Sequence, residues 1–167
     1  HAETVDPSLT TTRSPAISAV RRQGPIMIDG YAAEAAWNEA PAGKNFWQRN
    51  PNEGGPPELA TEFRVLYDDQ AVYVAVRAFD SDPRQVRGLL TRRDEHSASD
   101  WIWVGLDSYF DKRTAFAFGL NPAGVERDVL LYGDTNDDDS WNAVWEGAAA
   151  TDEQGWSAEF RIPLGQL

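Results

Sequence analysis

Seven tryptophans are the side chains of this 167-residue sequence best suited to contact a ligand. A flat indole can stack on the apolar face of a sugar ring, while neighbouring Asp, Asn, Gln or Arg groups form hydrogen bonds with its hydroxyls. Trp101 and Trp103 lie two residues apart, so they would share one face of a strand, with Ile102, Val104 and Leu106 on the other. If the aliphatic face is buried, the two indoles form an exposed shelf, which usually marks a contact surface.

The other tryptophans divide into candidate contacts and candidate core residues. Trp47, in a polar setting, and Trp141, after an acidic loop, suit ligand or partner contact as well as plain packing. Because large aromatic side chains dominate core packing, we predict that Trp37, Trp145 and Trp156 lie in the core. With polar partners included, the candidate ligand-binding residues are Trp47, Trp101, Trp103, Trp141, Arg92 and Asn136.

Four arginines, Arg84, Arg87, Arg92 and Arg93, cluster in a mainly acidic chain. The guanidinium group makes rigid, forked contacts with carboxylates. The cluster is therefore either a solvated surface or a docking patch for a partner protein.

The segment from Asp134 to Asp139 collects carboxylate and amide oxygens, which are the hard ligands that calcium prefers. It resembles the start of an EF-hand loop, but Asp139 replaces the glycine required there and Trp145 stands where the last ligand is needed. The alternative interpretation is a solvated acidic turn. The candidate calcium ligands are Asp134, Asn136, Asp138 and, from a neighbouring segment, Asp128.

The usual signatures of catalysis are missing from the sequence. It has no Gly-x-Ser-x-Gly elbow, no phosphate-cradling Gly-Lys-Ser/Thr loop and no His-Glu-x-x-His helix. The absence of cysteine excludes disulfides, thiolate metal sites and cysteine nucleophiles. His1, His96 and Met27 are the only ordinary axial ligands for haem, and Met27 falls in an expected core strand. We therefore expect no enzyme activity and no haem or nucleotide cofactor.

The net charge of −12 argues against nucleic acid and anionic lipid as partners, because both are negatively charged. No apolar stretch is long enough to form a membrane-spanning helix. The sequence begins His1-Ala2-Glu3, which we interpret as the product of signal-peptide cleavage. A periplasmic or cell-surface location in a Gram-negative-type bacterium is the resulting expectation.

The pattern along the chain predicts an arm followed by one domain. Residues 1–24 are rich in Ser, Thr and Pro and lack an apolar period, which is typical of an extended arm. Residues 25–167 predict one folded domain with a short strand at 25–28, a short helix near 31–38, and alternating segments at 62–67, 72–76, 101–107, 114–120, 125–132, 144–150 and 156–162. This spacing favours an all-β, antiparallel two-sheet sandwich of the jelly-roll or immunoglobulin-like kind.

Several short landmarks recur in a recognisable order. They are Ile28-Asp29-Gly30 with Glu34 and Trp37, Tyr67-Asp68 before Val72 to Val76, Asp80 to Pro83, Asp100 with Asp107, Asn121 to Val125, Trp141 with Trp145, and Gly155-Trp156 with Glu159 and Ile162-Pro163. This order resembles the family-9 carbohydrate-binding-module fold, especially the version at the N-terminus of uncharacterised bacterial outer-membrane barrel proteins. The resemblance implies a two-sheet sandwich, often with bound calcium, that grips a saccharide between aromatic side chains.

Two functions follow as expectations. The first is a non-catalytic, extracytoplasmic binding module that takes a glycan or other small ligand through exposed tryptophans and polar loops. The alternative is a docking subunit that has lost sugar binding and attaches to a periplasmic-side membrane protein complex through the N-terminal arm and exposed aromatic residues.

Overall fold

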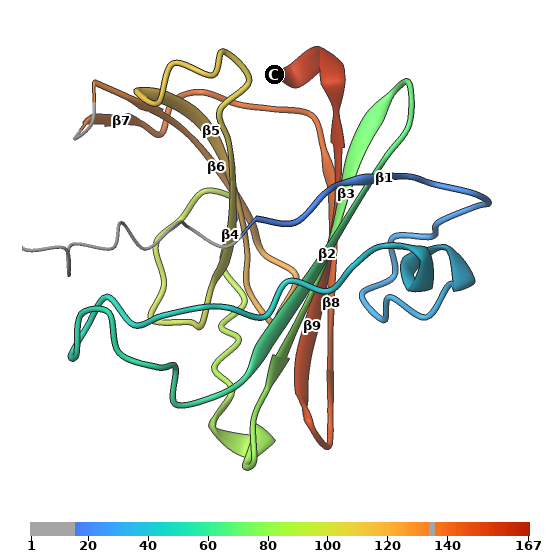
Figure 1. Ribbon diagram of the computed structural model, residues 1–167. Coiled ribbons are helices and arrows are strands. Elements are labelled where there is room, and N and C mark those ends of the chain that lie inside the picture. Colours follow the sequence, from blue (N-terminus) through green and yellow to red (C-terminus); the bar gives the residue numbers. More distant parts are fainter. Residues whose placement is uncertain (1–15, 134–135) are drawn as a thin grey trace, which may run out of the picture.

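Two β-sheets packed face to face form the body of the protein in the computed structural model, which describes residues 16–133 and 136–167 (Figure 1). The first sheet has the strand order β1-β2-β3-β9-β8 and the second has the order β4-β5-β6-β7. The strands are β1 (Val20–Arg21), β2 (Thr61–Tyr67), β3 (Ala71–Phe79), β4 (Ile102–Leu106), β5 (Thr114–Leu120), β6 (Glu126–Tyr132), β7 (Asn136–Asp138), β8 (Glu146–Asp152) and β9 (Gly155–Pro163). All pairings except β1 with β2 are antiparallel. The predicted all-β sandwich is confirmed.

The turn between β2 and β3 is built by Asp68. One carboxylate oxygen of Asp68 accepts the backbone N–H groups of Gln70, at 2.8 Å, and Ala71, at 2.9 Å. This local bonding reverses the chain and pairs Tyr67 with Val72 at the closed end of the hairpin. The predicted hairpin is therefore present, with strands slightly longer than expected.

An asparagine organises the turn between β5 and β6. The side-chain oxygen of Asn121 accepts the N–H groups of Ala123, at 3.0 Å, and Val125, at 2.9 Å, and its amide donates to the carbonyl of Leu89 at 2.9 Å. Gly124 has a φ of +77°, a backbone conformation that favours glycine. The turn sets the register that places Gly119 opposite Arg127.

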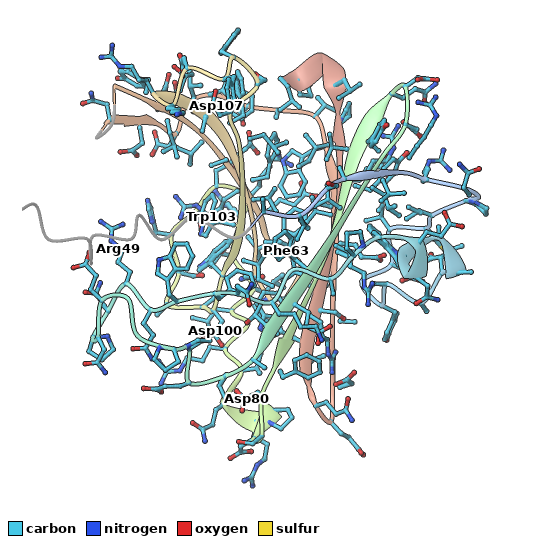
Figure 2. The ribbon with its side chains drawn as sticks, viewed as in Figure 1. Arg49, Phe63, Asp80, Asp100, Trp103 and Asp107 are labelled. Atoms are coloured by element: carbon cyan, nitrogen blue, oxygen red, sulfur yellow. The ribbon has the colours of Figure 1, made fainter. Side chains whose placement is uncertain are left out.

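The core lies between the two sheets and is rich in aromatic rings. Trp145 stacks on Phe160, with ring centroids 5.6 Å apart and an interplanar angle of 9°, and meets Phe118 edge-on. Trp145 and Trp156 are both buried in this cluster, as predicted. Figure 2 shows Phe63, a partly buried member of the same cluster, between the layers.

The outer face of the first sheet is covered by the segment before β2, seen as the light-blue coil beside the sheet in Figure 1. Its 3-10 helix η1 (Ala35–Glu39) buries Trp37 against Leu66, Tyr73 and Ala75, so the prediction that Trp37 is a core residue is confirmed. The indole N–H of Trp37 donates to the carboxylate of Glu159 at 3.0 Å.

Three local predictions about the N-terminal part differ from the structure. The helix expected at 31–38 is a shorter 3-10 helix, because Gly30 (φ +92°) and Ala32 (φ +50°) hold the backbone outside the helical region. The strand expected at 25–28 does not form. Instead Val20–Arg21, inside the expected arm of residues 1–24, pairs in parallel with β2 as β1.

Two further 3-10 helices flank the sheets, η2 (Pro83–Gln85) and η3 (Leu164–Gln166). Across residues 16–133 and 136–167, no helix has the length and apolar character needed to cross a membrane.

Candidate functional site

The outer face of the second sheet carries a groove with a volume of about 760 Å³. It lies opposite the covered outer face of the first sheet. The core takes Ile102, Val104 and Leu106 of β4, so the alternate residues of that strand face outward. Groove residues of the sheet are Trp103 and Gly105 from β4, Ala115 and Ala117 from β5, and Arg127, Val129 and Leu131 from β6. Of the pair predicted to form an exposed shelf, Trp103 is exposed and lines the groove, whereas Trp101 is half-buried and does not line it.

One wall of the groove is an aromatic cluster at its β4 side. The rings of Trp101 and Trp103 stack with centroids 5.8 Å apart and an interplanar angle of 30°. Trp101 is half-buried, while 42% of Trp103 is exposed, so Trp103 offers the indole surface that a ligand can reach. Figure 2 shows Trp103 on the side of β4 that faces away from the first sheet.

A glycine on the central strand lets this cluster form. Trp103, Gly119 and Arg127 lie opposite one another on β4, β5 and β6. A Cβ atom at Gly119 would come within 2.7 Å of the Trp103 ring, so only glycine allows the indole to lie across β5. The guanidinium carbon of Arg127 lies 5.4 Å from the Trp103 centroid and 5.6 Å from the Trp101 centroid, within cation–π range.

Arg127 is an unusual residue for this position because it is only 8% exposed. One terminal nitrogen lies 3.1 Å from Nε2 of His96. Its Nε–H group is buried and has no hydrogen-bond partner among the described residues. A buried, charged donor without a protein partner is costly, so Arg127 stands out among the residues that line the groove.

The floor of the groove is made of small side chains. Gly105, Ala115 and Ala117 leave the sheet surface low between Trp103 and the far rim. A Cβ atom at Gly105 would meet no atom within 4 Å, so the space above this glycine is open. A flat ring could lie there beside the indole.

The loop between β4 and β5 forms one rim and is held by carboxylates at its base. Asp107 accepts the N–H of Lys112 at 2.8 Å, and Asp111 accepts the N–H groups of Arg113 and Thr114, both at 2.8 Å. These backbone hydrogen bonds, led by that of Arg113, lower the pKa of Asp111. Lys112 and Arg113 line the groove on this rim, and Tyr132, Asn136 and Asp137, from the end of β6 and from β7, line it at the same end of the sheet.

The structure brings together some of the predicted ligand-binding residues and separates others. Trp103 and Asn136 line the groove, and the ring of Trp101 stacks on that of Trp103. Trp47 is 57% exposed but belongs to the loop before β2 and does not line the groove, and the exposed Arg92 does not line it either. Trp141 packs on the core ring of Phe116, with centroids 5.0 Å apart.

Sequence reasoning missed Lys112, Arg113 and Arg127. The sequence did contain a usable signal for Arg127. Side chains alternate along a strand, so Arg127 and Val129 share one face while Asp128 and Leu130 share the other. The position of Arg127 opposite Trp103 depends on the pairing register, which no single strand reveals.

The described members of the predicted calcium set do not fit a shared ion site. The carboxylate of the buried Asp128 is bonded to Arg93, to the N–H of Ala143 and to the indole N–H of Trp145 at 3.2 Å. One carboxylate oxygen of Asp138 accepts hydrogen bonds from the backbone N–H and the hydroxyl group of Ser140. No group of three or more His, Asp or Glu side chains suited to a metal occurs in the part of the chain that the structure describes. Asp134 lies outside that part, so calcium binding stays a prediction.

Two buried glutamates have raised pKa values, and both have structural partners. Burial raises the pKa of Glu159, which bonds the N–H groups of Asp29, at 3.0 Å, and Gly30, at 2.8 Å. Burial likewise raises the pKa of Glu126, which accepts the N–H of Gly147 at 3.1 Å and pairs with Arg93. Neither glutamate lines the groove. The raised pKa values of both glutamates therefore follow from their burial in the fold.

Comparison with solved structures identifies the architecture. A family-9 carbohydrate-binding module from Caldicellulosiruptor kristjanssonii, in complex with cellotriose, aligns with a TM-score of 0.61 and 16% identity over 87% of this chain and 67% of that one. The fold is similar to that of family-9 carbohydrate-binding modules. The same kind of module from that organism in complex with glucose aligns with a TM-score of 0.59 and 17% identity, over 87% of this chain and 68% of the other.

A third similar structure is that of a Bacteroides uniformis protein provisionally described as carbohydrate-binding. It aligns with a TM-score of 0.62 and 10% identity, over 89% of this chain and 72% of that one. No family model and no curated protein matches the sequence. At these identities the likeness establishes the fold, while the ligand has to be argued from the groove.

Proposed function

We propose that this protein is a non-catalytic, extracytoplasmic carbohydrate-binding module whose ligand occupies the groove on the outer face of the second sheet. The single observation that carries the proposal is the juxtaposition of the exposed Trp103 indole with an open floor at Gly105 and a polar rim. An aromatic platform ringed by hydrogen-bonding groups suits the two surfaces of a sugar, one apolar and one polar. The sugar-bound family-9 modules that share the fold support the same function.

Each part of the groove has a role in this proposal. The ring of a saccharide stacks on Trp103 above Gly105 and Ala117, where no large side chain competes for the space. Lys112 and Asn136, which both line the groove, are placed to donate hydrogen bonds to hydroxyl oxygens. The periplasm or the cell surface is the proposed location, because polymeric glycans of the bacterial envelope are found there.

Substitution of the indole tests the proposal directly. A glycan array identifies the saccharides that the purified protein binds, and titration calorimetry then compares the wild-type protein with Trp103→Ala. We expect the variant to bind about five-fold more weakly, since stacking on an aromatic ring contributes on the order of 1 kcal/mol. Trp47→Ala, an exposed tryptophan outside the groove, is the matched control and should bind as the wild type does. Equal losses in both variants, or binding of no saccharide at all, would count against the proposal.

The docking alternative rests on a separate observation. Tyr109 and Phe110, in the loop after β4, are 67% and 83% exposed, an unusual concentration of bare aromatic surface. A docking subunit would copurify from native membranes with a larger assembly and lose it on Phe110→Ser or on deletion of residues 1–15, which leaves β1 intact. Such a subunit would show no saccharide-dependent change in tryptophan fluorescence.

A further inference from the structure

We propose that the ligand of the groove is an acidic saccharide, with one carboxylate bound by Arg127 and a further carboxylate bound by the cationic rim of Lys112 and Arg113, at the other end of the groove. This inference rests on the proposed function and names the class of sugar that the site takes. It follows from three features of the groove: its local charge, the state of Arg127 and the shape of the space beside Trp103.

The groove has the opposite charge balance to the rest of the molecule. The whole chain carries a net charge of −12, yet three cations, Lys112, Arg113 and Arg127, line the groove. The acids that line it are Asp107 and Asp137, and Asp107 is already bonded to backbone N–H groups of the rim loop. The lining residues therefore include three cations and two carboxylates, whereas the whole chain is strongly acidic, so an anion is favoured in the groove over the remaining surface.

None of the three groove cations forms an ion pair with a carboxylate of the described residues. Elsewhere the pattern is different, because Arg22, Arg77, Arg93 and Arg161 all contact an acidic side chain. The groove cations are therefore available to an incoming anion. Lys112 also adopts a φ of +59°, a conformation uncommon for lysine, which its N–H bond to Asp107 maintains.

Arg127 provides the most specific element. It is more than nine-tenths buried, it lines the groove, and its Nε–H has no partner among the described residues. Its guanidinium is held in place by the indoles of Trp101 and Trp103 and by the ring nitrogen of His96. A preorganised guanidinium in the groove wall, with no carboxylate partner among the described residues, matches a ligand carboxylate, which accepts hydrogen bonds through two oxygens.

The surroundings of Arg127 favour a sugar carboxylate over an acidic peptide. The open space above Gly105 adjoins the exposed indole of Trp103, so a ring lying there would stack on the indole. In a uronic acid the carboxylate is attached to the ring itself, so stacking on Trp103 and bonding to Arg127 on β6 can occur together. An acidic peptide side chain provides the charge but has no ring to fill the floor.

The test uses pairs of ligands that differ only in charge. Trimers of glucuronate, galacturonate and mannuronate are each titrated against the wild-type protein beside their own fully methyl-esterified forms. We expect at least one acid to bind ten-fold or more tightly than its ester. Because the protein is the same in both arms, this comparison does not depend on any variant being folded.

Variants then locate the charge recognition. Arg127→Gln is expected to remove the difference between acid and ester, while Arg49→Gln, which removes a cation that does not line the groove, keeps it. Since Arg127 is buried, Lys112→Gln and Arg113→Gln, both exposed on the rim, provide a second measurement and should each reduce the preference for the acid two-fold or more. Retention of the full preference in all three groove variants overturns the assignment.

The outcomes separate this inference from the proposed function. If saccharides bind but no acid binds more tightly than its ester, the acidic-sugar assignment is wrong and the carbohydrate-binding function stands. If neither charged nor neutral saccharides bind, the proposed function fails and this inference fails with it. A hexaglutamate peptide that binds as tightly as the best uronate trimer, and competes with it, overturns the assignment in favour of an acidic protein partner.

Discussion

Two glycines on the outer face of the second sheet have opposite effects on the groove. At Gly119 a side chain is excluded, because the Trp103 ring occupies the position of its Cβ atom. At Gly105 nothing occupies that position, and the space belongs to the groove. The first glycine places the indole, and the second leaves room beside it for a ligand.

The open space at Gly105 gives a test that does not disturb the tryptophans. Gly105→Val adds a side chain that suits a strand and whose Cβ atom meets no atom within 4 Å, so we expect the free energy of unfolding to change by no more than about 0.5 kcal/mol. Affinity for the saccharide should fall at least ten-fold because the floor is filled. Gly165→Ala, also in open space but outside the groove, should leave affinity unchanged. Normal affinity of a stable Gly105→Val protein would mean that the ligand binds elsewhere.

At the scale of elements, side chains reinforce the backbone pairing that attaches the short strand β1 to the first sheet. Arg22, next to β1, donates from Nε to Asp68 at 2.7 Å and lies over the ring of Tyr73, whose hydroxyl donates to the same carboxylate at 3.0 Å. Burial acts to raise the pKa of Asp68, but hydrogen bonds from the Gln70 N–H, Arg22 and the Ala71 N–H outweigh it and hold the pKa well below its usual range.

Asp68→Asn should therefore destabilise the protein by about 2 kcal/mol at neutral pH, the size expected for lost hydrogen bonds to a charged group. Because the pKa of Asp68 is lowered on folding, its stabilisation is present above the ordinary value of 3.8 and is lost as the pH falls through the lower folded value. Urea unfolding at a series of pH values should show that the wild-type protein has a higher free energy of unfolding than the variant between about pH 4 and 7. The two values should converge only in stronger acid. Asp69→Asn, an exposed neighbour paired with Arg21, is the control and should show little change. A wild-type advantage that vanished near neutral pH would contradict this role of Asp68.

The elements differ in how well the sequence predicts them. Strands such as Thr114–Leu120 were predictable because their apolar residues alternate and Asn121 gives a local turn signal. The β1 strand was not predictable, since two residues carry no period and its pairing with Leu66 and Tyr67 is long-range. The predicted start of the helix near residue 31 was wrong. The positive φ of Ala32 accompanies the packing of this segment on the sheet and has no sequence signature.

At the scale of the whole molecule, covering one sheet face and leaving the other open decides where a ligand can bind. The segment carrying η1 buries Trp37 on the outer face of the first sheet, whereas the corresponding face of the second sheet keeps its groove. The aromatic shelf of this site was predictable from the alternation of Trp101 and Trp103 with aliphatic residues. Arg127 and the rim cations were not, because they join the shelf only through strand register and a loop.

The most direct test of the groove as the ligand site is an NMR titration that follows the indole N–H signals of the seven tryptophans. The best-binding saccharide from the array is added to the labelled protein. We expect the signals of Trp101 and Trp103 to shift, together with backbone amides of β4, β5 and β6, while those of the buried Trp37, Trp145 and Trp156 stay in place. Shifts centred on Trp47 or on the outer face of the first sheet, with Trp103 unmoved, would contradict the account.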